Sequence, residues 1–123
     1  MAEDNAQAPA LDPVRFGRLL ELMGPERLRG FADRYVAGLA EPVPRAPGPA
    51  LERAAHRLVG QSGMLALDAT AAAWRRVEEA CRAGSDEGAV AHLLAEAENR
   101  TREGAEVLRR ALGPAVRDEP DRE

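Results

Sequence analysis

The chain has 123 residues and a formal net charge of −4; 45% of its residues are hydrophobic and 3% are aromatic. A chain of this length forms one domain with a modest core, and it is too short for a catalytic domain plus a cofactor domain. Because alanine is abundant while aromatic and β-branched residues are scarce, the composition favours packed helices over a sheet. The negative charge gives no reason to expect nucleic acid or a membrane as a partner.

Residue counts exclude several kinds of site. All 17 basic residues are arginine, which removes any mechanism based on lysine. Cys81 is the only cysteine, so the chain cannot form an internal disulfide, and no metal-ligand spacing is present. We therefore expect no metal site and no cofactor. No apolar run reaches the roughly 20 residues that span a bilayer, and the N-terminus lacks signal-peptide features, so a soluble cytoplasmic protein is expected.

Two helices are predicted before a proline-rich loop. Asp12 followed by Pro13 starts the first helix, and Gly24-Pro25 ends it. The second helix covers about residues 25–39, and the prolines in 41–49 prevent its continuation because they remove backbone donors and clash with the preceding turn. The apolar faces consist of Phe16, Leu19, Leu20 and Met23 in the first helix, and of Leu28, Phe31, Ala32, Tyr35 and Leu39 in the second.

Three further helices follow the loop. The third is predicted over about residues 49–67, Asp68 is expected to cap the fourth, and Gly84 closes the fourth. Ser85-Asp86-Glu87 opens the last helix, in which Gly104 weakens the helical pattern locally. The predicted core positions are Ala73, Trp74, Val77, Ala80 and Cys81 in the fourth helix, and Val90, Leu93, Leu94, Ala97, Thr101, Leu108 and Leu112 in the last.

The predicted fold is all-α. Short connections between amphipathic helices favour antiparallel neighbours, which predicts an antiparallel up-and-down four-helix bundle with a shorter additional helix at the N-terminus. The helical domain is expected to span residues 11–113. Residues 1–10 are expected to form a flexible N-terminus, and residues 114–123 a flexible acidic tail.

His56 lies off the buried face of the third predicted helix. The stripe that defines this face consists of Leu51, Ala55, Leu58, Ser62 and Leu65. At about 100° per residue, His56 falls about 140° from the middle of the stripe. Gly60 and Gly63 follow on the side of His56, so little side-chain cover is expected beside the imidazole. Another protein could therefore approach this ring closely.

The residues around His56 resemble a known family. The segment Ala55-His56-x-Leu58-x-Gly60-x-Ser62-Gly63-x-Leu65, followed by a helix with Val77-Glu78 and a terminating Gly84, is similar to the histidine-containing phosphotransfer (HPt) domain of bacterial phosphorelays. The resemblance implies a four-helix bundle in which His56 accepts a phosphoryl group from a receiver-domain aspartate and passes it to another receiver. It also implies response-regulator receiver domains and a hybrid histidine kinase as partners, with Mg²⁺ held in the receiver's aspartate pocket.

The chain departs from this family at two positions. Family members commonly carry lysine three residues after the histidine, where this chain has Val59. Arg53, about 60° around the helix from His56, is the best local replacement for that charge, and Arg57, about 100° around, is the second. A frequent family glycine is replaced by Ala66, which is expected to be small enough to preserve close helix packing. The surface expected to dock the partner consists of Glu52, Val59, Gly60 and Gly63.

Simpler interpretations of these residues stay open. His56 could be an ordinary surface histidine, and Gly60 with Gly63 could permit the close crossing of two helices. Arg53 and Arg57 could be ordinary solvated side chains, which is the usual state of arginine.

Other polar residues are interpreted without a functional role. His92 has no neighbouring acid or nucleophile, so it is expected to be structural or at the surface. The adjacent pairs Glu78-Glu79 and Asp86-Glu87 are interpreted as a solvated face and a helix start. Cys81 is expected to be a small buried hydrophobe.

The sequence thus favours a stand-alone, monomeric HPt-like phosphocarrier. No Gly-rich phosphate loop is present, so autophosphorylation from ATP is not expected. The main alternative is a degenerate HPt domain or helical adaptor that binds a receiver domain without phosphotransfer, and the missing lysine at Val59 keeps it open. A helical dimerisation module would need a broad exposed apolar face, which the stripes do not provide.

Overall fold

The computed structural model describes residues 10–113, which form five α-helices and no strand. The helices are α2 (Pro13–Met23), α3 (Pro25–Gly38), α4 (Pro49–Met64), α5 (Asp68–Arg82) and α6 (Glu87–Leu112). The all-helical prediction is confirmed. Apart from Ala10, the segments predicted to be flexible lie outside the described residues. None of these five helices combines the length and the apolar character that crossing a membrane requires.

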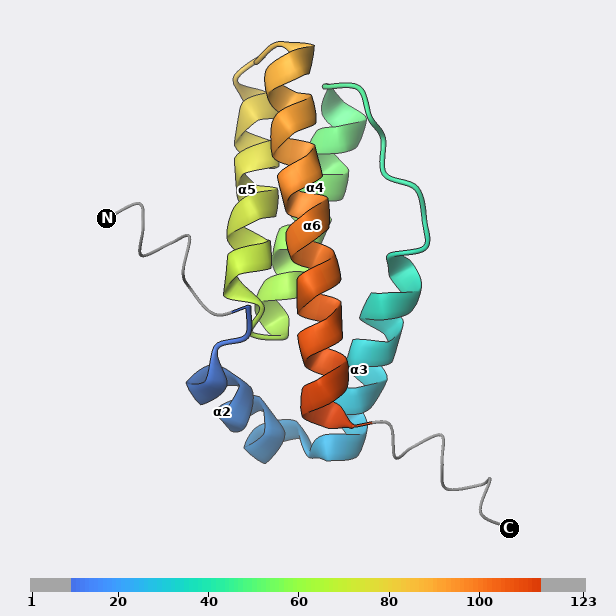
Figure 1. The fold of residues 1–123 in the computed structure, drawn as a ribbon, viewed down its shortest axis with the longest axis vertical. Helices are drawn as coiled ribbons and strands as arrows, with labels where there is room; N and C mark the ends of the chain where they lie inside the picture. Colours follow the sequence, from blue (N-terminus) through green and yellow to red (C-terminus); the bar gives the residue numbers. More distant parts are fainter. Residues whose placement is uncertain (1–9, 114–123) are drawn as a thin grey trace.

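Three helices lie side by side along the long axis of the molecule (Figure 1). α5 packs extensively against both α4 and α6. α3 lies beside the lower half of α6, while α2 lies across the base (Figure 1). The loop of residues 39–48 leads from the upper end of α3 to the upper end of α4 (Figure 1). This arrangement leaves one side of α4 facing away from the core.

The predicted helix starts are correct at two of three aspartates. The Asp12 carboxylate accepts hydrogen bonds from the amides of Val14 and Arg15 at 3.0 and 3.2 Å, and the Asp86 carboxylate accepts one from the Ala89 amide at 2.8 Å. The prediction that Asp68 caps the fourth helix is wrong.

Asp68 instead connects two helices. It is the first residue of α5, and Leu67 occupies the cap position without a side-chain hydrogen bond. The Asp68 carboxylate pairs with Arg15 of α2, whose Nη2 also donates to the Gly63 carbonyl at 2.7 Å. The tertiary contact with α2 therefore determines where this carboxylate lies.

The turn between α4 and α5 contains a left-handed residue. α4 ends at Met64, before the predicted Leu67, and Ala66 has a φ of 63°, the one positive φ outside glycine among the described residues. The Ala66 amide donates to the Gly63 carbonyl at 3.0 Å, and its own carbonyl accepts from the Asp12 amide at 2.9 Å. This backbone conformation favours glycine at position 66. Position 66 therefore has a conformational requirement, and Ala66 is also fully buried in the core.

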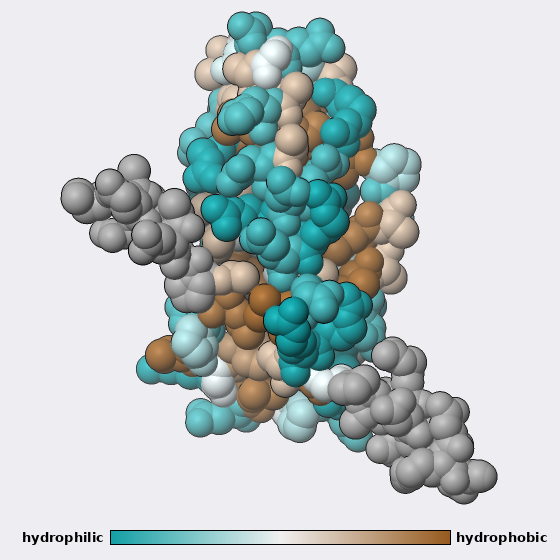
Figure 2. Space-filling view, in the orientation of Figure 1, coloured by the Kyte–Doolittle hydropathy of each residue, from teal (hydrophilic) through white to brown (hydrophobic). Residues whose placement is uncertain are grey.

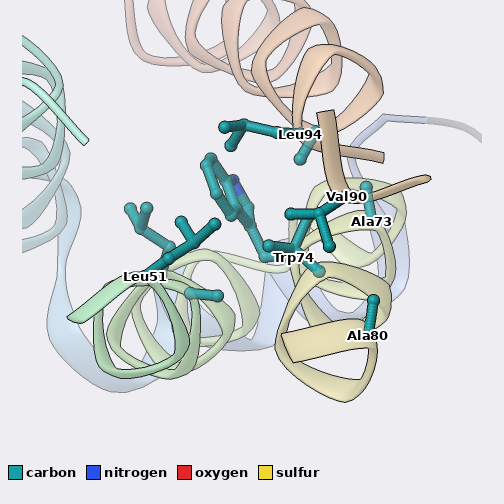
Figure 3. Close-up of a cluster of buried hydrophobic side chains, with 10 residues drawn as sticks. Leu51, Ala73, Trp74, Ala80, Val90 and Leu94 are labelled. Atoms are coloured by element: carbon teal, nitrogen blue, oxygen red, sulfur yellow. The ribbon is translucent and has the colours of Figure 1, made fainter. Parts of the chain in front are cut away.

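The core consists of two clusters of buried side chains. The upper cluster lies between α4, α5 and α6, and the indole of Trp74 extends from α5 toward the space between the other two helices (Figure 3). Its Nε1–H donates to the Thr101 hydroxyl at 2.8 Å, so the buried polar atom is satisfied. The lower cluster joins α2, α3, the α4–α5 turn and the end of α6, and contains Phe16. Cys81 is only partly buried at the margin of the upper cluster, so its predicted burial is incomplete.

Gly104 allows α5 and α6 to approach closely. A Cβ atom at this position would lie 3.1 Å from the Thr70 hydroxyl and 3.3 Å from Leu67. α6 continues through Gly104 without a break. The glycine that weakened the helical pattern is thus explained by close packing.

Hydrophilic residues cover much of α6 on the face shown in Figure 2, while hydrophobic residues gather near the base. The exposed large hydrophobic residues of the described range are Val14, Leu22, Val36 and Met64. They belong to three different helices, α2, α3 and α4.

Candidate functional site

His56 lies on the outer side of α4, with 76% of its side chain exposed. All five residues of the predicted stripe are buried, so the helical spacing placed the histidine correctly outside the core. A Cβ atom at Gly60 or Gly63 would meet nothing within 4 Å. These glycines therefore do not serve a close helix crossing, and they leave the surface beside the imidazole open.

One nitrogen of the exposed imidazole forms a hydrogen bond with a mostly buried carboxylate of α5. His56 Nδ1 lies 2.8 Å from Oε2 of Glu78, a residue of α5 whose side chain is 10% exposed. The prediction that Glu78 belongs to a solvated face is therefore wrong, although the neighbouring Glu79 is exposed. Successive helical residues point about 100° apart, so Glu78 turns toward α4 while Glu79 turns away from it.

Glu78 belongs to a network of four residues, Glu52, His56, Glu78 and Arg82, which we call the His56 network. Arg82 Nη2 donates to Glu78 Oε2 at 2.7 Å, and Arg82 Nε donates to Glu52 Oε2 at 3.1 Å. Glu52 lies one turn before His56 on α4, and Glu78 lies one turn before Arg82 on α5. The network is thus built from two pairs at helical spacing that face each other across the α4–α5 contact.

The charges in the network determine which ring nitrogen carries a proton. Burial alone would raise the pKa of the Glu78 carboxyl, but the hydrogen bonds and charges of His56 and Arg82 outweigh burial and lower it. The carboxylate is therefore ionised at neutral pH, and an ionised carboxylate can only accept hydrogen bonds. Nδ1 must then be the protonated nitrogen. In the neutral ring, the lone pair lies on Nε2, which has no hydrogen-bond partner among residues 10–113.

The two arginines expected to supply positive charge form no side-chain hydrogen bond with His56 or any other residue of the described range. Arg53 and Arg57 are both exposed, and neither forms an ion pair within residues 10–113. Arg57 instead lines a cavity of about 530 Å³ beneath the loop of residues 39–48. The structure places a different cation, Arg82, next to the histidine, and hydrogen bonds with Glu52 and Glu78 raise the pKa of its guanidinium.

The residues expected to dock a partner have different environments. Gly60 is exposed and Gly63 is partly buried. Glu52 is engaged with Arg82, and Val59 packs at the margin of the upper core cluster. The second histidine, His92, is exposed on α6.

Sequence reasoning missed the roles of Glu78 and Arg82. Glu78 had a signal, because Val77-Glu78 is part of the pattern that resembles the family. Arg82 had none, because its place beside His56 depends on how α5 packs against α4. Among residues 10–113, no group of three or more potential metal-ligating side chains is present.

Comparison with known protein families identifies a match. The family model of the Hpt domain matches residues 26–119, a range that begins after α2 and includes all but the first residue of α3 as well as α4, α5 and α6. No curated protein and no solved structure is significantly similar to the chain. Hpt domains transfer phosphoryl groups on histidine in phosphorelays, and they interact with receiver domains and histidine kinases. Since the match covers most of the chain, and the all-helical fold agrees with it, this chain belongs to the Hpt domain family.

Proposed function

We propose that His56 accepts a phosphoryl group from the aspartyl phosphate of one receiver domain and passes it to the aspartate of another. The contact between Nδ1 and Glu78, on a ring that is 76% exposed, carries this proposal. Because this hydrogen bond occupies Nδ1, the lone pair of Nε2 stays available to a receiver domain. A histidine that served only as a surface residue would give no reason to bury a carboxylate beneath it, since burying a charged group is costly.

The network fits the chemistry of transfer. Nε2 attacks phosphorus, an N–P bond forms, and the P–O bond to the donor aspartate breaks as its carboxylate leaves with the electron pair. Because Nδ1 keeps its proton, the ring becomes positively charged, and the Glu78 carboxylate stabilises that charge. In the onward step the acceptor aspartate attacks phosphorus, and the N–P electron pair returns to Nε2. Glu78 therefore orients the ring in both steps.

The family resemblance supports further parts of the proposal. The Mg²⁺ that assists transfer belongs to the receiver's aspartate pocket. We interpret α3 to α6 as an antiparallel up-and-down four-helix bundle, with α2 as the additional short helix. The protein acts as a cytoplasmic monomer between a hybrid histidine kinase and response regulators, and the open surface at Gly60 and Gly63 admits the receiver.

Incubation with a phosphorylated receiver domain and Mg²⁺ tests this function. Wild-type protein and the matched control His92→Gln should acquire an acid-labile, alkali-stable label, whereas His56→Gln should acquire none. Equal labelling of His56→Gln and the wild type would contradict the proposal, as would no labelling by any of a panel of receivers. Receiver binding without label would favour the degenerate domain or adaptor.

A further inference from the structure

Arg82 of α5 and His56 of α4 share a hydrogen-bond partner. His56 Nδ1 and Arg82 Nη2 lie 2.8 and 2.7 Å from the same oxygen, Oε2 of Glu78. We propose that Arg82 binds the phosphoryl oxygens of phosphorylated His56, in the place of the lysine that the chain lacks at Val59. This inference rests on the proposed function of His56.

Arg82 has the donors for this contact. A guanidinium carries five N–H donors, and the His56 network uses one on Nε and one on Nη2. Within the described part of the chain, Nη1 has no acceptor, and 59% of the side chain is exposed. Both Nη1 protons are therefore available to a phosphoryl group on the neighbouring ring.

The net negative charge of the network favours a cation in contact with the phosphoryl oxygens. Glu52 and Glu78 contribute two negative charges against the single positive charge of Arg82. A phosphoryl group near neutral pH adds close to two more negative charges, and the positively charged ring offsets only one of them. Without a cation in contact with the phosphoryl oxygens, the two carboxylates would oppose phosphorylation of His56.

Arg82 is also better ordered for this role than Arg53. Two carboxylates hold Arg82 beside His56, so little side-chain entropy is lost when it binds. Arg53 is exposed and has no ion pair within residues 10–113, so it would have to be ordered on binding.

The test uses phosphoramidate, a small donor that needs no receiver domain. Nε2 attacks its phosphorus, the donor's P–N bond breaks, and ammonia leaves as the new N–P bond forms. Phosphorus NMR follows the rate of this reaction and then the pKa of the phosphoryl group on His56. Arg82→Ala should slow labelling about tenfold, because one charged donor to the developing phosphoryl charge is lost. It should also raise the phosphoryl pKa, because a nearby cation favours the dianion.

Two variants of matched chemistry serve as controls. Arg82→Lys keeps a positive charge and should recover much of the rate. Arg76→Ala removes another exposed arginine of α5 and should behave like the wild type. Circular dichroism on each variant should show unchanged helicity.

Repeating the Arg82→Ala substitution in a Glu78→Gln protein separates direct contact with the phosphoryl group from an effect through Glu78. If Arg82 acted only by holding Glu78, Arg82→Ala would change nothing in a Glu78→Gln protein. A slower rate and a raised phosphoryl pKa in that background support the proposal, and their absence overturns it. The proposal would also be overturned if Arg53→Ala or Arg75→Ala, and not Arg82→Ala, slowed the labelling and raised the phosphoryl pKa.

The experiment also separates this proposal from the relay function. If phosphoramidate labels His56 and Arg82→Ala slows that labelling, the role of Arg82 stands even where no receiver domain donates. If phosphoramidate does not label His56 in the wild-type protein, the role of Arg82 is overturned.

Discussion

At the scale of single residues, the His56 ring is exposed to solvent and is also oriented by a hydrogen bond. Its side chain is 76% exposed, yet one nitrogen contacts a carboxylate that is 10% exposed. The exposure follows from the sequence, because a position far from the buried stripe of an amphipathic helix faces outward. The contact does not, because Glu78 lies 22 residues away on another helix. The sequence therefore identified the histidine, and only the packing of α5 identified the group that orients it.

The lowered pKa of Glu78 predicts a specific dependence of stability on pH. A carboxyl group whose pKa is lower in the folded state than its ordinary value of 4.5 stabilises the fold above that value. This contribution is lost as the pH falls through the lower, folded-state pKa. Glu78→Gln cannot titrate, so it should lose less stability between pH 7 and pH 3 than the wild type does. Urea unfolding at both pH values measures the difference, and equal losses would contradict the prediction.

At the scale of elements, the α4–α5 turn shows why helix ends are difficult to predict. The stripe of α4 continues to Leu65, so its spacing alone suggests a helix to residue 67. The helix stops at Met64 because the backbone of Ala66 is left-handed and its carbonyl binds the Asp12 amide of the segment before α2. Asp68 likewise pairs with Arg15 instead of capping α5. Both departures have the same cause, which is contact with a distant part of the chain.

Glycine should be tolerated better at position 66 than within α4. A left-handed alanine costs about 1–2 kcal/mol. Ala66→Gly removes that cost but loses a buried methyl group and gains unfolded-state entropy, so we expect a change within about 1 kcal/mol. Ala55→Gly is the matched control, since Ala55 is equally buried in regular helix. It should destabilise by about 1–2 kcal/mol from lost helix propensity and burial. Urea unfolding compares the two, and equal losses would argue against strain at Ala66.

At the scale of the whole molecule, α2 is part of the fold although it precedes the region matched by the family model. Phe16 is 6% exposed and belongs to the lower core cluster. Arg15 binds the α4–α5 turn through Asp68 and the Gly63 carbonyl. These contacts attach α2 next to the end of the helix that carries His56.

Removing the aromatic anchor of α2 should therefore destabilise the whole domain. Phe16→Ala should lower the free energy of unfolding by about 3–5 kcal/mol, as for other buried aromatic side chains. Val14→Ala, at a position 68% exposed on the same helix, should change it by less than about 0.5 kcal/mol. Unfolding monitored by circular dichroism gives both values. A negligible effect of Phe16→Ala would show that α2 is dispensable for the stability of the fold.

The sequence by itself determined the helical class, the helix order, the buried stripe of α4 and the exposure of His56. These features follow from local periodicity and from helix-breaking residues, which act over a few turns of chain. Tertiary structure alone decided that Glu78 is buried beneath His56, that Arg82 joins it, and that Arg15 holds Asp68. Each of these contacts joins residues on different helices or depends on such a contact. Periodicity shows which face of a helix is polar, but the neighbour that packs against that face decides which polar residues meet.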